Sequence, residues 1–236
     1  MKHPDEKTTG EERWQTSLLA NVEKKALLWI APKLPEWITP DMLTFLGLIG
    51  IMGCGLSYYI MHQRWWFLIL ASIGLVINWL GDSLDGTLAR VRNRQRPKYG
   101  YYLDHLVDAF GITCLIFGLA YSGIVSQPVI WLVMALFLIA SINTYLATNS
   151  VNVFKISYQR ISTTEARVLL IIMNTVLIFA KKIHIFGWTF FWLDFIAGLG
   201  ALFLFIVTIR SAYLNLRKLD REERAAWKSP PKSHIQ

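Results

Sequence analysis

This chain has few cysteines, and its first residues do not form an apolar run. Cys54 and Cys114 are the two cysteines among 236 residues, and both lie inside apolar runs. That setting is typical of small hydrophobic side chains in helices, which argues against a disulfide framework or a cysteine metal site. The first residues, MKHPDEKTTGEER, are polar, so no signal peptide is expected.

We find no internal repeat in the sequence and expect no appended soluble domain. Apolar residues are abundant instead: they make up 54% of the chain, and its mean hydropathy is +0.38. Soluble domains already contain about 45–50% apolar residues, so the fraction alone decides little. Here, however, these residues cluster in runs close to the roughly 20 residues of a membrane-spanning helix. The runs predict an all-α integral membrane protein with one compact domain.

Six such runs predict six transmembrane helices. They lie near residues 41–61, 65–82, 99–121, 128–147, 163–180 and 190–213. Ahead of them, over 14–36, apolar residues recur at helical spacing among charged ones, a pattern that predicts an amphipathic helix lying on the membrane surface. Beyond the last run the chain is charged and contains proline, and we expect a mobile tail there.

The charge pattern completes this outline. We expect a polar segment with the surface helix over 1–40, a six-helix transmembrane domain over 41–216 and a charged tail over 217–236. The net charge of +8 would suggest nucleic acid in a soluble protein, but here it suits anionic headgroups, and no nucleic acid is expected. Lys and Arg are concentrated in the loops after the second and fourth spans and in the tail. The positive-inside rule therefore places both termini on the cytoplasmic side.

Four aspartates lie near the ends of the second and third predicted spans. Asp82 and Asp85 are three residues apart and Asp104 and Asp108 are four apart, so each pair lies on one face of a helix. Charged side chains at the edge of an apolar span predict a functional site. Two antiparallel helices joined by a short loop would aim the four carboxylates into one cleft. Carboxylate oxygens suit hard cations such as Mg²⁺ or Mn²⁺, and two ions would balance the four charges.

Small and basic residues continue the face that begins at Asp82. Gly86 and Ala89 leave room for a phosphate to approach, and Arg90 can bind one bidentately. The aspartates could instead serve only as ion-pair partners of the loop arginines. That role would not require two acidic pairs at helical spacing, so a binding site is favoured. The basic residues of the loop itself fit either a solvated loop on the cytoplasmic side or contacts to a substrate. They are Arg92, Arg94, Arg96 and Lys98.

These residues resemble the signature of the CDP-alcohol phosphotransferase family, DxxDGxxAR…GxxxDxxxD. Every defining position is filled, from Asp82 through Arg90 and from Gly100 through Asp108. The resemblance implies transfer of a substituted phosphoryl group from a CDP-alcohol, such as CDP-diacylglycerol, to an acceptor hydroxyl, with release of CMP, in phospholipid biosynthesis. It also implies a homodimer, because members of that family are often dimeric.

The resemblance assigns roles by position. The metal-ligand positions are Asp82, Asp85, Asp104 and Asp108, and Asp108 also matches the general base. The positions that line the nucleotide and its diphosphate are Gly86, Ala89 and Arg90. Thr44 belongs to a segment, PDMLT, that resembles the PNxLT opening of the family, with Asp41 where asparagine is usual. Thr44 is thus a nucleotide-side candidate, or else a hydroxyl bonded to its own helix.

Four further residues have two interpretations each. Asn78 either supports the site or makes an interhelical hydrogen bond. His105 follows Asp104 as in the choline and ethanolamine branch of the family, and it either assists proton transfer or contacts a neighbouring helix. Arg160 and Arg167 match the region that holds the phosphate of phosphate-bearing acceptors, or they are flanking positive charge.

Three alternative functions remain on the sequence. An aminoalcohol phosphotransferase of the CDP-choline or CDP-ethanolamine type, acting on a lipid hydroxyl, would use the same signature. A membrane prenyltransferase also uses aspartate motifs and Mg²⁺, but its two acidic motifs lie far apart in sequence. A cation transporter would place its carboxylates near the bilayer midplane, whereas these lie toward the cytoplasmic ends of the spans.

Overall fold

The computed structural model describes residues 20–61, 64–151, 163–179 and 192–227. Within these ranges every regular element is a helix, which confirms the all-α prediction. The elements are α1 (Ala20–Ile30), η1 (Ala31–Lys33), α2 (Pro40–Ile60), α3 (Phe67–Val91), α4 (Pro97–Ser122), α5 (Gln127–Val151), α6 (Thr163–Phe179) and α7 (Trp192–Trp227).

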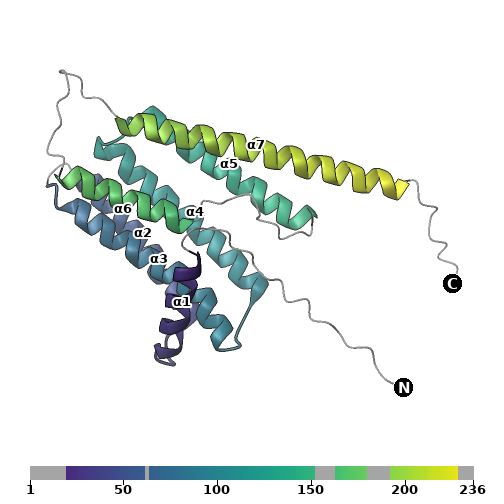
Figure 1. Cartoon of the computed structure of the whole chain (residues 1–236), viewed down its shortest axis with the longest axis horizontal. Helices are drawn as coiled ribbons and strands as arrows, with labels where there is room; N and C mark the ends of the chain where they lie inside the picture. Colours follow the sequence, from purple (N-terminus) through teal and green to yellow (C-terminus); the bar gives the residue numbers. More distant parts are fainter. Residues whose placement is uncertain (1–19, 62–63, 152–162, 180–191, 228–236) are drawn as a thin grey trace.

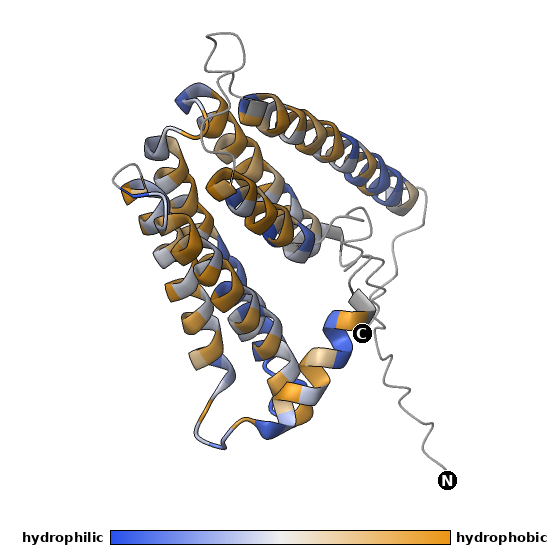
Figure 2. Cartoon of the chain, turned by 60° about the vertical axis from the view of Figure 1, so that its left-hand side comes forward, coloured by the Kyte–Doolittle hydropathy of each residue, from blue (hydrophilic) through white to orange (hydrophobic). Residues whose placement is uncertain are grey.

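The membrane-spanning segments follow the predicted runs. Five helices, α2, α3, α4, α5 and α7, are long and apolar enough to cross a membrane. The fifth predicted span corresponds to α6, which has 17 described residues. Figure 2 shows apolar residues along most of the length of the bundle helices, with hydrophilic ones gathered toward helix ends and along the far part of α7. The protein is therefore an integral membrane protein.

Three helices continue beyond the ends of their predicted spans. α3 runs to Val91, past the predicted end of the second span near residue 82. α5 reaches Val151, past the predicted end near residue 147, and α7 continues to Trp227, through the start of the predicted mobile tail. The charged part of α7 stays helical because its charges alternate at i,i+4. The pairs are Lys218–Glu222 at 3.7 Å and Arg224–Asp220 at 2.7 Å. At the other end, α1 stops at Ile30, and the part of the predicted surface helix before residue 20 lies outside the described residues.

Figure 1 shows α2, α3, α4 and α6 as a bundle, with α5 and α7 paired beside it and α1 crossing one end of the bundle steeply. Within the bundle, α2 packs on both α3 and α4, α6 packs on α3, and α5 joins α4 to α7. The part of α1 and η1 that faces the bundle is apolar: Leu27 and Ala31 pack with Leu43, Leu84 and Leu88. The helix predicted to lie on the membrane surface is thus docked on α2 and α3.

Glycines allow α2 to touch α3 and α4 backbone to backbone. A Cβ on Gly81 would lie 2.5 Å from the amide nitrogen and 2.7 Å from the Cα of Gly47, and a Cβ on Gly118 would collide with the carbonyl oxygen of Gly55. Backbone atoms cannot move aside as a flexible side chain can, so these crossings require glycine. The Gly81 contact matters most for the site, because the next residue is Asp82.

Buried hydrogen bonds fix the rotation of α6. The Tyr58 hydroxyl donates to Asn174 Oδ1 at 2.7 Å, and Asn174 Nδ2 donates to Ser72 Oγ at 3.0 Å. Asn174 is fully buried, so in an apolar surrounding these bonds favour one orientation of the helix. Arg167 lies two turns before Asn174 and therefore on the same face of α6, toward α3.

The α3–α4 connection is short and well anchored. Residues 92–96 join the two helices, and Pro97 occupies the first turn of α4, where its missing N–H is harmless. Arg92 donates to four backbone oxygens: Leu34 at 2.9 Å, Pro35 at 2.8 Å, Glu36 at 3.3 Å and Ile38 at 2.5 Å. Arg96 pairs with Asp41 at 2.5 Å, and this carboxylate raises the pKa of the guanidinium. Arg92 and Arg96 thus hold the α3–α4 connection to the segment before α2 and to the start of α2. The sequence analysis expected a solvated loop or contacts to a substrate and did not anticipate this role.

We predict that Gly81→Ala destabilises the fold by about 1–3 kcal/mol, because the added methyl group pushes α3 off the backbone of α2. Thermal unfolding of the detergent-solubilised protein, followed by loss of the monodisperse peak, measures this effect. Gly53→Ala is the matched control: a Cβ there meets nothing within 4 Å. Helix propensity makes that change neutral or stabilising by up to about 1 kcal/mol. Equal melting temperatures for the two variants would contradict the prediction.

Candidate functional site

The α3–α4 hairpin brings three of the four predicted carboxylates together. One oxygen from each of Asp82, Asp104 and Asp108 lies within 4.8 Å of the other two. At 1.5 Å per residue, Asp82 lies about 14 Å before the end of α3, and Asp104 and Asp108 lie about 10 and 17 Å after the start of α4. The hairpin therefore places the three at matching depth, and this cluster is called the aspartate triad below.

Asp85, the fourth predicted ligand, is not part of this 4.8 Å group. Its Oδ2 accepts a hydrogen bond from the Thr44 hydroxyl at 2.6 Å, and its Oδ1 accepts from the amide of Gly86. The Thr44 hydroxyl also lies 3.2 Å from the Pro40 carbonyl oxygen. Thr44 therefore makes both the contact to its own helix and a contact that the sequence did not predict, to a candidate ligand.

Arg167 of α6 forms an ion pair with the triad. Its Nη2 donates to Asp82 Oδ2 at 2.6 Å, and its side chain is 12% exposed. Its Nη1 is buried and has no hydrogen-bond partner among the described residues. One guanidinium cannot balance three carboxylates, so the triad keeps an excess of negative charge that favours a bound cation. Hard divalent ions suit a ligand set made of carboxylate oxygens.

The face of α3 that carries the small residues Gly86 and Ala89 begins about one turn beyond Asp82. Arg90 is exposed, and its Nη2 donates to Thr87 Oγ1 at 3.0 Å. A Cβ at Gly86 would lie 3.4 Å from Arg90 Nη1, so the guanidinium lies next to the glycine. Ala89 is half-buried on the same helix, and Gly100 of α4 has open space around it. The predicted nucleotide-side residues are therefore neighbours on or facing α3.

His105 and Asn78 make contacts between helices. His105 Nδ1 lies 2.9 Å from the Tyr101 carbonyl oxygen and 3.8 Å from Asp104 Oδ2. Its ring lies 4.0 Å from that of Tyr101 and 5.0 Å from that of Tyr145, between centroids. Asn78 Nδ2 donates to the Gly47 carbonyl oxygen at 3.0 Å. Of the two interpretations of Asn78, the interhelical hydrogen bond is the one found.

Glu23 on α1 is a contact of this region that the sequence analysis missed. Its Oε1 accepts hydrogen bonds from Trp79 Nε1 at 2.9 Å and from Ser83 Oγ at 2.8 Å. The Thr164 hydroxyl lies 3.2 Å from Oε1 and 3.1 Å from Oε2. A signal was present: Glu23 precedes Leu27 by four residues, so it is an acid on the face of α1 that is otherwise apolar. The predicted acceptor residue Arg160 lies outside the described residues.

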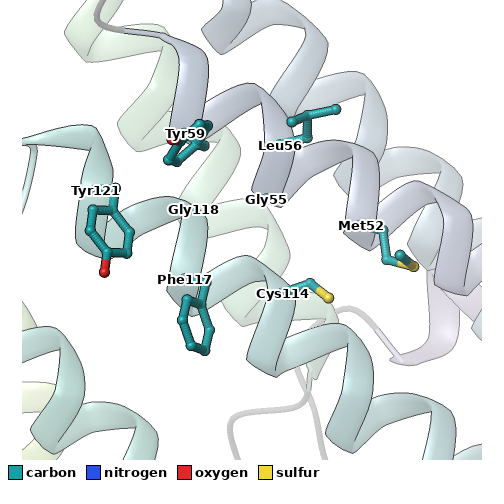
Figure 3. Close-up of a pocket in the computed structure, with 8 residues that line it drawn as sticks. All are labelled: Met52, Gly55, Leu56, Tyr59, Cys114, Phe117, Gly118 and Tyr121. Atoms are coloured by element: carbon teal, nitrogen blue, oxygen red, sulfur yellow. The ribbon is translucent and has the colours of Figure 1, made fainter.

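A groove between α2 and α4 is separate from the aspartate triad. Figure 3 shows Gly55 and Gly118 at the crossing of the two helices, with Tyr59, Phe117 and Tyr121 around them. Its volume is about 300 Å³, and no charged side chain lines it. It begins at Cys114, about 15 Å further along α4 than Asp104. Its apolar lining gives it no part in the chemistry of the carboxylates.

Comparison with known proteins agrees with this geometry. A sequence model of the CDP-alcohol phosphatidyltransferase family matches residues 37–207. The chain is 33% identical to archaetidylinositol phosphate synthase of Pyrococcus horikoshii over 97 residues, 41% of this chain and 48% of that protein. It is 32% identical to CDP-diacylglycerol–glycerol-3-phosphate 3-phosphatidyltransferase of Cereibacter sphaeroides over 107 residues, 44% and 45% of the two chains.

A third relative comes from another branch. The chain is 30% identical to cholinephosphotransferase 1 of Xenopus laevis over 90 residues, which cover 36% of this chain and 22% of that protein. The alignments thus span about half or less of the length of these curated relatives. The family match is much longer, extends over most of the chain, and includes all four signature aspartates. The chain belongs to the CDP-alcohol phosphatidyltransferase family.

Proposed function

We propose that this protein transfers a substituted phosphoryl group from a CDP-alcohol, such as CDP-diacylglycerol, to an acceptor hydroxyl in phospholipid biosynthesis, with release of CMP. The observation that carries the proposal is the aspartate triad, whose carboxylate oxygens lie within 4.8 Å of one another beside Arg167. Membership of the CDP-alcohol phosphatidyltransferase family supports the reaction class.

The residues fit one or two divalent ions, Mg²⁺ or Mn²⁺. Three convergent carboxylates with a single guanidinium beside them form an oxygen-rich, negatively charged ligand set. Asp82, Asp104 and Asp108 would hold an ion, and Asp85 would join them by turning away from Thr44. When bound, such ions neutralise a diphosphate and stabilise the negative charge that develops on the leaving CMP.

Asp108 is the proposed general base. Its carboxylate takes the proton of the acceptor hydroxyl while the acceptor oxygen forms a bond to the β-phosphorus of the CDP-alcohol. The bond between that phosphorus and the oxygen bridging to CMP breaks, and CMP leaves with the electron pair. Arg90, beside Gly86, is placed to pair with the diphosphate of the donor.

Arg167 is the proposed contact for the acceptor. Its Nη2 pairs with Asp82, and its buried Nη1 has a hydrogen to donate and no partner among the described residues. A phosphate or a polar hydroxyl group of the acceptor would satisfy it, because burying a donor without a partner is unfavourable. Arg160 remains a second candidate for this role.

The second candidate is an aminoalcohol phosphotransferase that uses a CDP-choline or CDP-ethanolamine donor and a lipid hydroxyl. It is favoured by the pairing of Asp104 with His105, which lie 3.8 Å apart, and by the similarity to cholinephosphotransferase 1. His105 would then assist proton transfer. Both functions use the same triad, and they differ in which substrate carries the lipid.

The remaining assignments concern placement in the membrane. We propose that the triad and both termini face the cytoplasm, because the basic connection between α3 and α4 lies at the same end of the hairpin as the carboxylates. We propose the division into an N-terminal segment (1–40), a catalytic transmembrane domain (41–216) and a charged tail (217–236). A homodimer is proposed by family analogy alone.

The proposed reaction predicts release of CMP from a CDP-alcohol, and loss of that release when a chelator removes divalent ions. The purified protein is incubated with CDP-diacylglycerol or a CDP-aminoalcohol and a panel of acceptors, with and without EDTA, and products are separated by chromatography. The donor that is consumed distinguishes the two candidate functions. Pyrophosphate release from a prenyl diphosphate would instead indicate a prenyltransferase, and cation flux with neither product would indicate a transporter.

Substitution of single carboxylates separates their roles. Asp85→Asn is expected to lower turnover by about 100-fold or more while the protein still folds and inserts, because a metal ligand is lost.

Asp108→Asn is expected to bind the CDP-alcohol yet transfer about 10²–10⁴-fold more slowly, because the proton acceptor is lost. Asp220→Asn, the same change on the exposed end of α7, is the control. Substantial residual transfer by Asp108→Asn would move the base assignment to His105.

The charge of Arg167 predicts an effect on metal affinity that is independent of turnover. Arg167→Gln removes a positive charge 2.6 Å from Asp82. Mn²⁺ should therefore bind about tenfold more tightly, although transfer is impaired. Titration of the protein with Mn²⁺, followed by electron paramagnetic resonance of the free ion, measures this affinity. Arg217→Gln on exposed α7 should leave it unchanged, and weaker binding by Arg167→Gln would show that the guanidinium supports the ion.

A further inference from the structure

Glu23 joins three helices through one carboxylate. α1 supplies the acid, α3 supplies Trp79 and Ser83 as donors, and α6 supplies Thr164, all at 2.8–3.2 Å. Glu23 is half-buried, and each of these donors is uncharged. A carboxylate that accepts hydrogen bonds from several neutral donors is well stabilised without an ion pair.

The donors lie next to residues of the proposed site. Ser83 follows Asp82 directly, and Trp79 lies one turn before it on α3. On α6, Thr164 lies one turn before Arg167, on the same face. Two bridges therefore connect α3 to α6 at this level: the direct pair between Asp82 and Arg167, and an indirect one through Glu23. The second bridge exists only while α1 is docked.

α1 itself lies between the bundle and its surroundings. On one face, Leu27 is buried against α3 with Leu84 and Leu88. On the other, Val22 and Trp29 are 69% and 66% exposed. The ammonium group of Lys33 lies 3.0 Å from the centre of the Trp29 ring. Apolar and basic groups on an outward face suit the interface of a bilayer.

We propose that Glu23 is a positioning residue, which holds α1 against α3 and α6 and thereby sets the spacing between Asp82 and Arg167 on the acceptor side of the site. Its effect on catalysis rests on the function proposed above. Glu23 does not touch the reacting atoms in this scheme: it acts by fixing Ser83 and Thr164, and through them the two helices that carry the ion pair. The surface helix is then a structural part of the acceptor site.

Two substitutions show whether Glu23 acts through its hydrogen bonds, which tether α1 to α3 and α6, or through its negative charge. Glu23→Gln keeps an oxygen that can accept from Trp79 and Ser83, and its new amide can donate to the Thr164 hydroxyl. The tether is therefore preserved although the charge is lost. Glu23→Ala removes the tether altogether. Glu36→Ala removes an exposed carboxylate from the same region of the chain and is the matched control.

The first measurement is amide hydrogen exchange of the full-length protein in lipid nanodiscs, read by mass spectrometry. In Glu23→Ala, peptides from α1 and from the first half of α6 should exchange about tenfold faster than in the wild type, because the side-chain hydrogen bonds that resist local opening are lost. Glu23→Gln and Glu36→Ala should match the wild type. Unchanged exchange in Glu23→Ala, or equal acceleration in Glu23→Gln, would overturn the proposal.

The second measurement is kinetic and tests the link to the site. Glu23→Ala should raise the KM for the acceptor about tenfold while leaving the KM for the CDP-alcohol within about twofold, because Arg167 and not Arg90 is displaced. Thr164→Val should act in the same direction, and Thr164→Ser should restore wild-type behaviour. Equal increases in both KM values would indicate general loosening and contradict the proposal. If the wild-type protein had no transferase activity, only the proposed function would be contradicted. The hydrogen-exchange measurement would still test whether Glu23 holds α1 against α3 and α6.

Discussion

Mutual repulsion among the carboxylates of Asp82, Asp104 and Asp108 is the constraint on which the rest of the structure depends. Three such groups within 4.8 Å, in an apolar bundle, are unfavourable unless other interactions hold them there. Backbone contact at Gly81 fixes α3 against α2, and Arg92 holds the end of the α3–α4 hairpin to the segment before α2. Arg167 supplies partial compensation. The remaining negative charge is what makes the cluster suited to a divalent cation.

The segment before the first span contributes more than an attachment to the membrane. Arg92 reaches back to four of its carbonyl oxygens, and Glu23 reaches forward to α3 and α6. The proposed catalytic helices are thus enclosed at one end by a helix that also has an exposed apolar face.

The features that could be predicted from sequence are those that depend on local spacing. Apolar runs of spanning length predicted the helices, and the spacing of four aspartates predicted which of them share a helix face. The helix ends were less predictable: the charged end of α7 has the composition of a tail, but its i,i+4 pairs make it a helix through Trp227. The aspartates that face one another across α3 and α4 followed from the short connection, since it requires antiparallel neighbours at matching depth.

By itself the sequence determined the helices, the hairpin and the acidic faces, because these depend on residues no more than about one connection apart. The tertiary structure alone decided which side chains meet across the bundle. The Thr44 hydroxyl donates a hydrogen bond to Asp85, and Arg167 pairs with Asp82. Glu23, near the start of the chain, contacts Thr164 on α6. These contacts depend on how each helix is rotated and how closely its neighbours approach. Glycine backbone contacts and the buried Asn174 set both, and such long-range packing leaves no periodic pattern in the sequence.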